Sequence, residues 1–272
     1  MNYNLIINSY LPALTKSEKI VAEYVLNNSN KVMHSTLQEI SKQTNVGEAT
    51  VLRFCNRIGC DKFADLKLLI AQSSELNEKK ISNTSSPIES TTANMISIIE
   101  DTKSLLDEES INTTITLIEK SKRLWLYGVG SSGLSALIGE SNFRRIGVFS
   151  HAINEPHFQA LNSTSLSKDD LVLAFSISGN TKDTYEACLI AKNNGAKIVA
   201  ITNYIESEIA KIADCVLLTA AREHLLKGGT LTGTVSQLFV IDVLKVAYTN
   251  KHKEKVKQSM DKMARSIMNK SL

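Results

Sequence analysis

Two short segments combine glycines with hydroxyl side chains at the start of a predicted helix. The first reads Gly-Val-Gly-Ser-Ser-Gly over residues 128–133, and the second reads Ser-Ile-Ser-Gly-Asn-Thr over residues 176–181. Glycines let the backbone approach a ligand closely, and backbone N–H groups with hydroxyls at a helix start bind anions. Two such segments that converge on one point would suit a phosphomonoester.

Two other interpretations of these segments are open. The segments can be ordinary strand-to-helix turns in which the hydroxyls only cap the helices. The first segment also fits the Gly-x-Gly-x-x-Gly pattern of dinucleotide sites, which requires an acidic residue about 20 positions later at a strand end. Glu155 lies in that interval, but it stands beside Pro156 without a clear strand end, and the second segment has no role in a dinucleotide site.

Short apolar runs that alternate with helical patterns must position these segments. We expect strands over residues 124–128, 171–175, 197–202 and 215–218, with 149–153 as a less regular fifth. We expect helices over 96–106, 111–118, 132–146, 181–194 and 207–212, and over about 17 residues from 235. Such alternation predicts a doubly wound parallel sheet, in which ligands bind at the carboxyl ends of the strands.

A second group of residues nearer the N-terminus has the pattern of a DNA reader. A short helix over 36–44, a break at Asn45-Val46-Gly47 and a helix over 48–57 predict a helix-turn-helix. Arginine side chains match guanine edges or phosphates, and Arg53 and Arg57 lie one turn apart. A plain helical bundle would show the same spacing. The residues expected at the DNA are Gly47, Glu48, Ala49, Thr50, Arg53, Asn56 and Arg57.

Composition divides the chain into four parts. Residues 78–94 are rich in Ser, Thr and Asn around Pro87 and lack apolar periodicity, which is typical of a linker. This linker separates a helical domain over 1–77 from a sheet domain over 95–250, whose core is 111–250. The last part, 251–272, is a basic helix or tail, since residues 245–272 carry eight Lys and Arg against two Asp and Glu. This tail is either a solvated helix face or a contact with phosphates or an acidic partner.

Overall composition excludes several classes of protein. The chain has 272 residues, of which 43% are hydrophobic, so global disorder is excluded. No apolar run is long enough for a membrane span, and residues 1–10 lack the basic start and small-residue cleavage site of a signal peptide, so we expect a cytoplasmic protein without a membrane partner. The four cysteines (Cys55, Cys60, Cys188 and Cys215) form no metal-binding pattern, so we expect them to be reduced and the protein to hold no metal or cofactor.

Residues 14–70 resemble the N-terminal domain of RpiR-type transcriptional regulators. The stretches that carry the resemblance are LTKSEKIVAEYVL (14–26), LQEISKQTNVGEATVLRFCNRIG (37–59) and KFADLKLLI (62–70). Gly47 stands where this family often has serine, and glycine is an acceptable helix cap. The resemblance implies sequence-specific binding to operator DNA as a dimer.

Residues 111–250 resemble a SIS (sugar isomerase) domain. The resemblance rests on LYGVGSSG (126–133), LAFSISGNT (173–181), AKNNGAKIVAITN (191–203) and VSQLFVIDVL (235–244). In that family the hydroxyl loops hold the phosphate of a phosphosugar. The resemblance implies this role for Ser131, Ser132, Ser176, Ser178 and Thr181 and for the backbone of Gly179 and Asn180. Glu223, where family members often have Glu, could accept sugar hydroxyls, and His157, in the loop after the segment 149–153, could reach the ligand.

The predicted fold is therefore α + α/β, an all-helical helix-turn-helix domain joined to a doubly wound SIS domain. An isomerase needs a base near the substrate carbons, and no acidic or histidine pair stands out, so we name no catalytic residue. We predict a regulator of carbohydrate metabolism genes whose affinity for double-stranded operator DNA depends on a bound phosphosugar, working as a homodimer or homotetramer. The alternative is a phosphosugar isomerase or lyase whose helical part serves oligomerisation.

Overall fold

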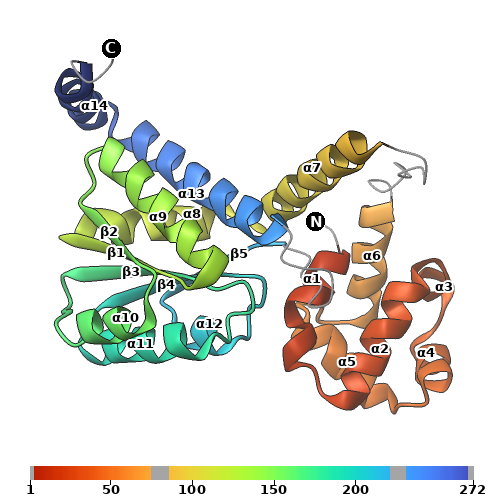
Figure 1. The fold of residues 1–272 in the computed structure, drawn as a ribbon. Helices are drawn as coiled ribbons and strands as arrows, with labels where there is room; N and C mark the ends of the chain where they lie inside the picture. Colours follow the sequence, from red (N-terminus) through yellow and green to blue (C-terminus); the bar gives the residue numbers. More distant parts are fainter. Residues whose placement is uncertain (1–2, 75–85, 221–230, 269–272) are drawn as a thin grey trace. The chain divides into compact units, whose positions relative to one another are not determined.

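The computed structural model describes residues 3–74, 86–220 and 231–268, which Figure 1 draws as a ribbon. The chain divides into two compact units, Met1–Ser97 and Ile98–Leu272. The first unit is helical and the second contains a parallel sheet. This is the predicted combination of an all-α part with an α/β part.

The first unit packs short helices around one apolar core. Its elements are α1 (Tyr3–Tyr10), a 3-10 turn (Leu11–Ala13), α2 (Lys16–Asn27), α3 (Ser29–His34), α4 (Leu37–Thr44), α5 (Glu48–Arg57) and α6 (Phe63–Ser74). Thr15 and Thr36 begin α2 and α4 with reciprocal capping hydrogen bonds to the glutamates three residues later. Val21, Ile40 and Phe54 are fully buried, so α2, α4 and α5 share this core.

The break between α4 and α5 depends on one left-handed residue. Asn45, the C-cap of α4, has φ 53°, a conformation that asparagine tolerates better than most residues. The Ser41 hydroxyl donates to the Val46 carbonyl at 2.6 Å and fixes the turn. Helix α5 then begins at Glu48, with Gly47 as its N-cap, so the predicted helix-turn-helix elements are confirmed.

Residues 87–94 of the predicted linker are helical and form the start of α7 (Pro87–Leu105). Ser86 and Glu89 make a capping box, since each accepts a hydrogen bond from the backbone N–H of the other. Proline at the first position of a helix loses no hydrogen bond, and its fixed φ suits the helix. Pro87 therefore starts a helix here and does not interrupt one.

The second unit is built on five parallel strands in the order β2-β1-β3-β4-β5. The strands are β1 (Arg123–Tyr127), β2 (Ser150–Ile153), β3 (Asp170–Phe175), β4 (Lys197–Thr202) and β5 (Cys215–Leu218). Helices α8 (Glu108–Lys120), α9 (Gly130–Arg145) and α13 (Thr232–Lys251) cover one face. Helices α10 (Pro156–Ser163), α11 (Lys182–Asn193) and α12 (Glu208–Ile212) cover the other (Figure 1). The predicted doubly wound sheet, including its uncertain strand over 149–153, is confirmed.

The central strand explains why both faces are covered. All six residues of β3 are buried. Leu171 and Leu173 pack into the core beneath α9 and α13, while Val172 and Ala174 pack into the core on the α11 side. Side chains of a strand alternate between the two faces, so a continuous apolar run needs helices on both.

A buried carboxylate holds the amino ends of β1 and β3 together. Asp170 accepts two hydrogen bonds from Arg123, at 2.6 and 2.7 Å, and one from Trp125 Nε1 at 3.1 Å. Burial alone would raise the pKa of Asp170, but these hydrogen bonds and that of the Ser167 N–H lower it below its ordinary value. The carboxylate therefore stays ionised and fully partnered.

Helix α14 (Lys253–Ile267) holds most of the basic tail and continues the second unit. Val256 is its buried anchor in the core shared with α9 and α13, while its lysines at 253, 255, 257 and 262 are exposed. Gly147 has φ 79°, and a Cβ there would lie 2.2 Å from Ser259 Oγ of this helix. The close approach at Gly147 lets α14 pack against the turn after α9.

Candidate ligand site and nucleic-acid interface

The first hydroxyl segment occupies the end of β1 and the first turn of α9. Ser131 is exposed, whereas Ser132 is only 8% exposed and its Oγ accepts a hydrogen bond from Gln237 Nε2 at 3.0 Å. A Cβ on Gly128 would lie 2.7 Å from the Ser132 carbonyl oxygen, and a Cβ on Gly133 would lie 2.8 Å from Cβ of Asn154. These positions require glycine because the backbone turns tightly beside the loop that follows β2.

The second hydroxyl segment joins β3 to α11. Ser176 is buried, and its Oγ lies 2.9 Å from Oγ1 of Thr181. The Asn180 N–H donates to Ser178 Oγ at 3.2 Å, so the Ser178 proton remains available to another acceptor. Gly179, with φ 62°, closes the turn, and a Cβ there would lie 2.0 Å from Ser207 Oγ.

The start of α12 holds this second segment in place. The Ile209 N–H donates to the Gly179 carbonyl oxygen at 3.0 Å, and the Glu208 N–H donates to Asn180 Oδ1 at 3.0 Å. Two backbone N–H groups of one helix, α12, therefore fix the conformation of the loop. Side chains held in this way are preorganised for a ligand.

The two segments lie at the point where the sheet reverses its direction of winding. Strands β1 and β3 are hydrogen-bonded neighbours, and the helices that follow them, α9 and α11, cover opposite faces. A crevice outside the carboxyl ends of the strands is expected at this point in doubly wound sheets. Seven predicted residues share this edge: Ser131, Ser132, Ser176, Ser178, Gly179, Asn180 and Thr181.

The first turns of α9 and α11 have backbone donors to offer. Val129 and Thr181, the N-caps of α9 and α11, make no side-chain capping bond, a property that these helices share with α3, α5, α13 and α14. The first N–H groups of a helix have no partner inside the helix. Together with the hydroxyls, they suit an anion that accepts several hydrogen bonds.

His157 lies in the first turn of α10 and not in a loop, which corrects the sequence-based placement. Its side chain is 96% exposed, and its Nδ1 lies 2.9 Å from Glu155 Oε1. The hydrogen bond and the charge of Glu155 raise the pKa of His157. Glu155 is the N-cap of α10 and accepts the Phe158 N–H at 2.8 Å. Glu223, the other additional candidate, lies outside the described residues.

Two buried glutamines that hold the first segment were not among the predicted residues. Gln159 of α10 donates to the carbonyls of Gly128 and Ile153 at 3.0 and 2.7 Å. Gln237 of α13 donates to Ser132. Both side chains are fully buried. In a sequence, such residues can be recognised as a polar side chain at a helix position that the apolar periodicity assigns to the core.

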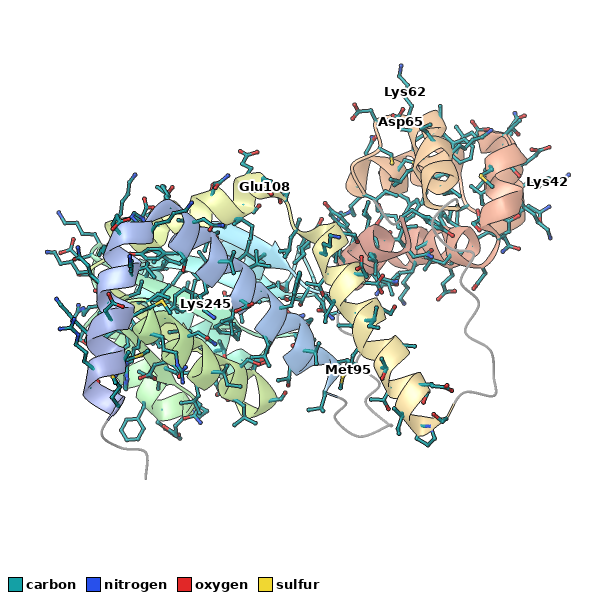
Figure 2. The ribbon with its side chains drawn as sticks, turned by 90° about the horizontal axis from the view of Figure 1, so that it is seen from above. Lys42, Lys62, Asp65, Met95, Glu108 and Lys245 are labelled. Atoms are coloured by element: carbon teal, nitrogen blue, oxygen red, sulfur yellow. The ribbon has the colours of Figure 1, made fainter. Side chains whose placement is uncertain are left out.

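Helix α5 presents most of the predicted DNA-binding residues to solvent. Gly47, Glu48, Ala49, Arg53 and Asn56 are exposed, while Thr50 and Arg57 are partly buried. The Arg53 guanidinium donates to Thr50 Oγ1 at 2.9 Å, which holds its side chain along the helix surface. Lys42, on the preceding α4, also projects outward (Figure 2) and was not among the predicted residues.

Arg57 has a different environment from Arg53. Its Nε lies 3.8 Å from Glu18 Oε1, and it donates to the Ala13 carbonyl at 3.5 Å. The side chain of Arg57 is 35% exposed and that of Glu18 is 5% exposed. Arg57 therefore ties α5 to the start of α2, and its position as a DNA contact stays a prediction.

Protonation of Glu18 is expected to loosen the start of α2. Burial raises its pKa, but hydrogen bonds from Thr15 and the charge of Arg57 lower it, so the net pKa lies below the ordinary 4.5. A lowered pKa means that the carboxylate stabilises the fold above pH 4.5 and ceases to do so as the pH falls through its folded value. Glu18→Gln should therefore cost about 1 kcal/mol at pH 7 and less at pH 3.5.

Hydrogen exchange of the α2 amides in the wild type and in this variant checks the prediction at both pH values. Lys16→Gln, at an exposed position of the same helix, is the control. A difference between wild type and Glu18→Gln that is equal at both pH values would contradict it.

Three classes of feature are missing from the part of the chain that the structure describes. Its helices include none with the length and apolarity to cross a membrane. Its His, Cys, Asp and Glu side chains form no group of three or more that could hold a metal ion. Its four cysteines are free, and burial raises the pKa of Cys55 and of Cys188 to about 12, which makes both thiols poor nucleophiles.

Both parts of the chain match known protein families. Residues 1–77 match the helix-turn-helix domain of the rpiR family, and residues 117–247 match the SIS domain. The solved structure of the Vibrio vulnificus NanR protein complexed with ManNAc-6P aligns over 99% of both chains with a TM-score of 0.67 and 24% identity, a likeness of fold.

Two curated relatives are similar over nearly their whole length. A helix-turn-helix-type transcriptional regulator of Haemophilus influenzae is 32% identical over 249 residues, which cover 88% of this chain and 86% of that protein. The regulator HexR of Escherichia coli is 27% identical, over 96% of this chain and 92% of that protein. The chain therefore belongs to the RpiR family of helix-turn-helix transcriptional regulators that carry a SIS domain.

Proposed function

We propose that this regulator binds operator DNA through α5 and that a phosphosugar held by the two hydroxyl segments controls its affinity for that DNA. The observation that carries the proposal is the pair of segments at the ends of the neighbouring strands β1 and β3. Their donors and uncapped helix starts suit the three oxygens of a phosphomonoester. NanR, which shares the fold, was solved with a phosphorylated amino sugar.

The proposed effector class is a phosphorylated sugar, and the genes controlled are those of carbohydrate metabolism. A thermal-shift panel of hexose, hexosamine, N-acetylhexosamine and pentose phosphates tests the class, with each unphosphorylated sugar as its matched control. Binding to the folded state raises the Tm by mass action. A panel in which no phosphosugar raises the Tm above its control would overturn the proposal.

The regulatory step is tested with a gel shift on a duplex selected from a random pool by the full-length protein. We expect salt-dependent and sequence-selective binding whose affinity changes when the active phosphosugar is added. Symmetric half-sites in the selected duplex would agree with a homodimer or homotetramer. Turnover of a phosphosugar without any DNA shift would favour the alternative, an isomerase or lyase.

Replacement of Ser178 by alanine is expected to weaken phosphosugar binding by about 1.5–3 kcal/mol, because a charged phosphate oxygen loses a hydrogen-bond donor. The backbone N–H of Asn180 already satisfies the Ser178 oxygen, so the hydroxyl proton is the group that the ligand would use. Isothermal titration calorimetry measures the loss. Ser165→Ala, at an exposed serine after α10, is the matched control and should bind as the wild type does.

A further inference from the structure

Gln237 makes a contact that is unusual for a fully buried side chain. Its Nε2 donates to Ser132 Oγ at 3.0 Å, but its Oε1 is buried and has no hydrogen-bond partner among the residues that the structure describes. A buried polar atom without a partner costs about 1–3 kcal/mol. Such atoms are rare in folded proteins.

The direction of the hydrogen bond determines what Ser132 can offer to a ligand. A serine hydroxyl has one proton to donate. Since Ser132 Oγ accepts from the amide of Gln237, its own proton is not used in this contact. A phosphate oxygen can only accept, so it needs that proton. The opposite orientation of the amide would consume the proton and leave Ser132 without a donor for an anion.

In the second hydroxyl segment, a serine oxygen also accepts a hydrogen bond, but the donor is a backbone N–H and not a side chain. There the Asn180 N–H donates to Ser178 Oγ, which also leaves the serine proton available. In the first segment a side chain from α13, 105 residues from Ser132, supplies the equivalent donor. Two serines at the ends of neighbouring strands are thus both prepared as donors.

Gln159 shows how a purely structural glutamine differs. Its Nε2 donates to two backbone carbonyls, those of Gly128 and Ile153, and its Oε1 also has no partner among the described residues. Loss of Gln159 would leave buried carbonyls that cannot rearrange. Loss of Gln237 would leave only a hydroxyl, which can rotate, so the Gln237 contact has little structural purpose.

We propose that Gln237 is a positioning residue for the phosphate, and that it acts by holding Ser132 as a hydrogen-bond donor toward the anion. The proposal rests on the proposed phosphosugar site and names the side chain that prepares its first segment. Gln237 itself does not touch the ligand, because the side chain is fully buried.

The test is the affinity of the full-length chain for inorganic phosphate, measured by calorimetry at constant ionic strength. Gln237→Met keeps the shape of the side chain and should weaken phosphate binding about fivefold. It should leave the Tm of the ligand-free protein unchanged or higher, because the unpartnered oxygen is removed.

Gln237→Glu should weaken phosphate binding about tenfold or more, since the carboxylate accepts the Ser132 proton and repels the anion. Ser236→Ala, also buried on α13, should keep wild-type affinity.

A double-mutant cycle with Ser132→Ala identifies the route of the effect. If Gln237 acts through Ser132, Gln237→Met should cause no further loss of affinity in the Ser132→Ala background. A further loss there would overturn the proposal, and so would wild-type affinity in Gln237→Met or a wild type that does not bind phosphate. The phosphosugar panel decides the proposed function separately, because binding of a phosphosugar by the wild type supports that function whatever the Gln237 variants do.

Discussion

Replacement of Arg53 by alanine is expected to weaken binding to the selected operator about 5- to 150-fold, the loss of about 1–3 kcal/mol typical of an arginine contact. Arg53 is exposed on α5, and its only described hydrogen bond is to Thr50 of the same helix, so the guanidinium is available to a base edge or a phosphate. Gel shifts at several salt concentrations measure the effect.

The salt dependence separates two roles for Arg53. A phosphate contact would weaken binding to all sequences and reduce the salt slope by about one, whereas a base contact would weaken binding to the operator alone. Lys31→Ala, at an exposed position on α3, is the matched control and should bind the operator normally. Equal loss of operator and phosphosugar affinity in Arg53→Ala would contradict separate roles for the two units.

Gly179→Ala should abolish the response to phosphosugar and destabilise the sheet unit by about 2–4 kcal/mol. An alanine at φ 62° pays about 1–2 kcal/mol for the left-handed backbone. Its Cβ would also lie 2.0 Å from Ser207 Oγ and 2.7 Å from Thr202 Oγ1, so the loop must move away from β4 and α12. The movement would displace Ser178 and Asn180 from their positions. Thermal shift with and without the phosphosugar measures both effects.

Gly195→Ala is the matched control for this substitution. Gly195 also has a positive φ, 95°, but it ends α11 at the opposite end from the hydroxyl segment, and its nearest neighbour would be Lys168 N at 3.3 Å. We expect a smaller loss of stability, about 1 kcal/mol, and a normal phosphosugar response. A wild-type response in Gly179→Ala would show that this loop does not hold the ligand.

The buried strands were predictable because each is a short apolar run flanked by polar turns. Residues 171–175 and 197–202 read as buried strands, and the structure has them as β3 and β4. The hydroxyl segments followed from the same reading, because their glycines and serines come directly after β1 and β3. Local patterns therefore placed the sheet and the main part of the candidate site.

The start of α7 and the whole of α10 were missed for one shared physical reason. Pro87 lies in the predicted linker and Pro156 lies beside His157, which was placed in a loop. Each proline instead occupies the first turn of a helix, next to a capping Ser86 or Glu155. Proline lacks only the N–H that a helix start leaves unbonded, so the preceding cap decides whether it starts a helix or interrupts one.

Polar contacts between residues far apart in the sequence could not be predicted from sequence periodicity. Arg57 was grouped with Arg53 because the two residues lie one turn apart, yet Arg57 pairs with Glu18 of another helix. Gln237 and Ser132 meet only because α9 and α13 cover the same face of the sheet. The partner of a polar side chain is set by the packing of helices, which spacing within one helix does not reveal.

The position of Trp125, which lies beside the buried Asp170, allows the two units to be followed separately by spectroscopy. Trp125 is the single tryptophan of the chain and lies on β1, so tryptophan fluorescence reports on the sheet unit alone. Circular dichroism, by contrast, sums the helices of both units. Where the two signals change at different denaturant concentrations, the units unfold independently, and each can then be assigned its own free energy of unfolding.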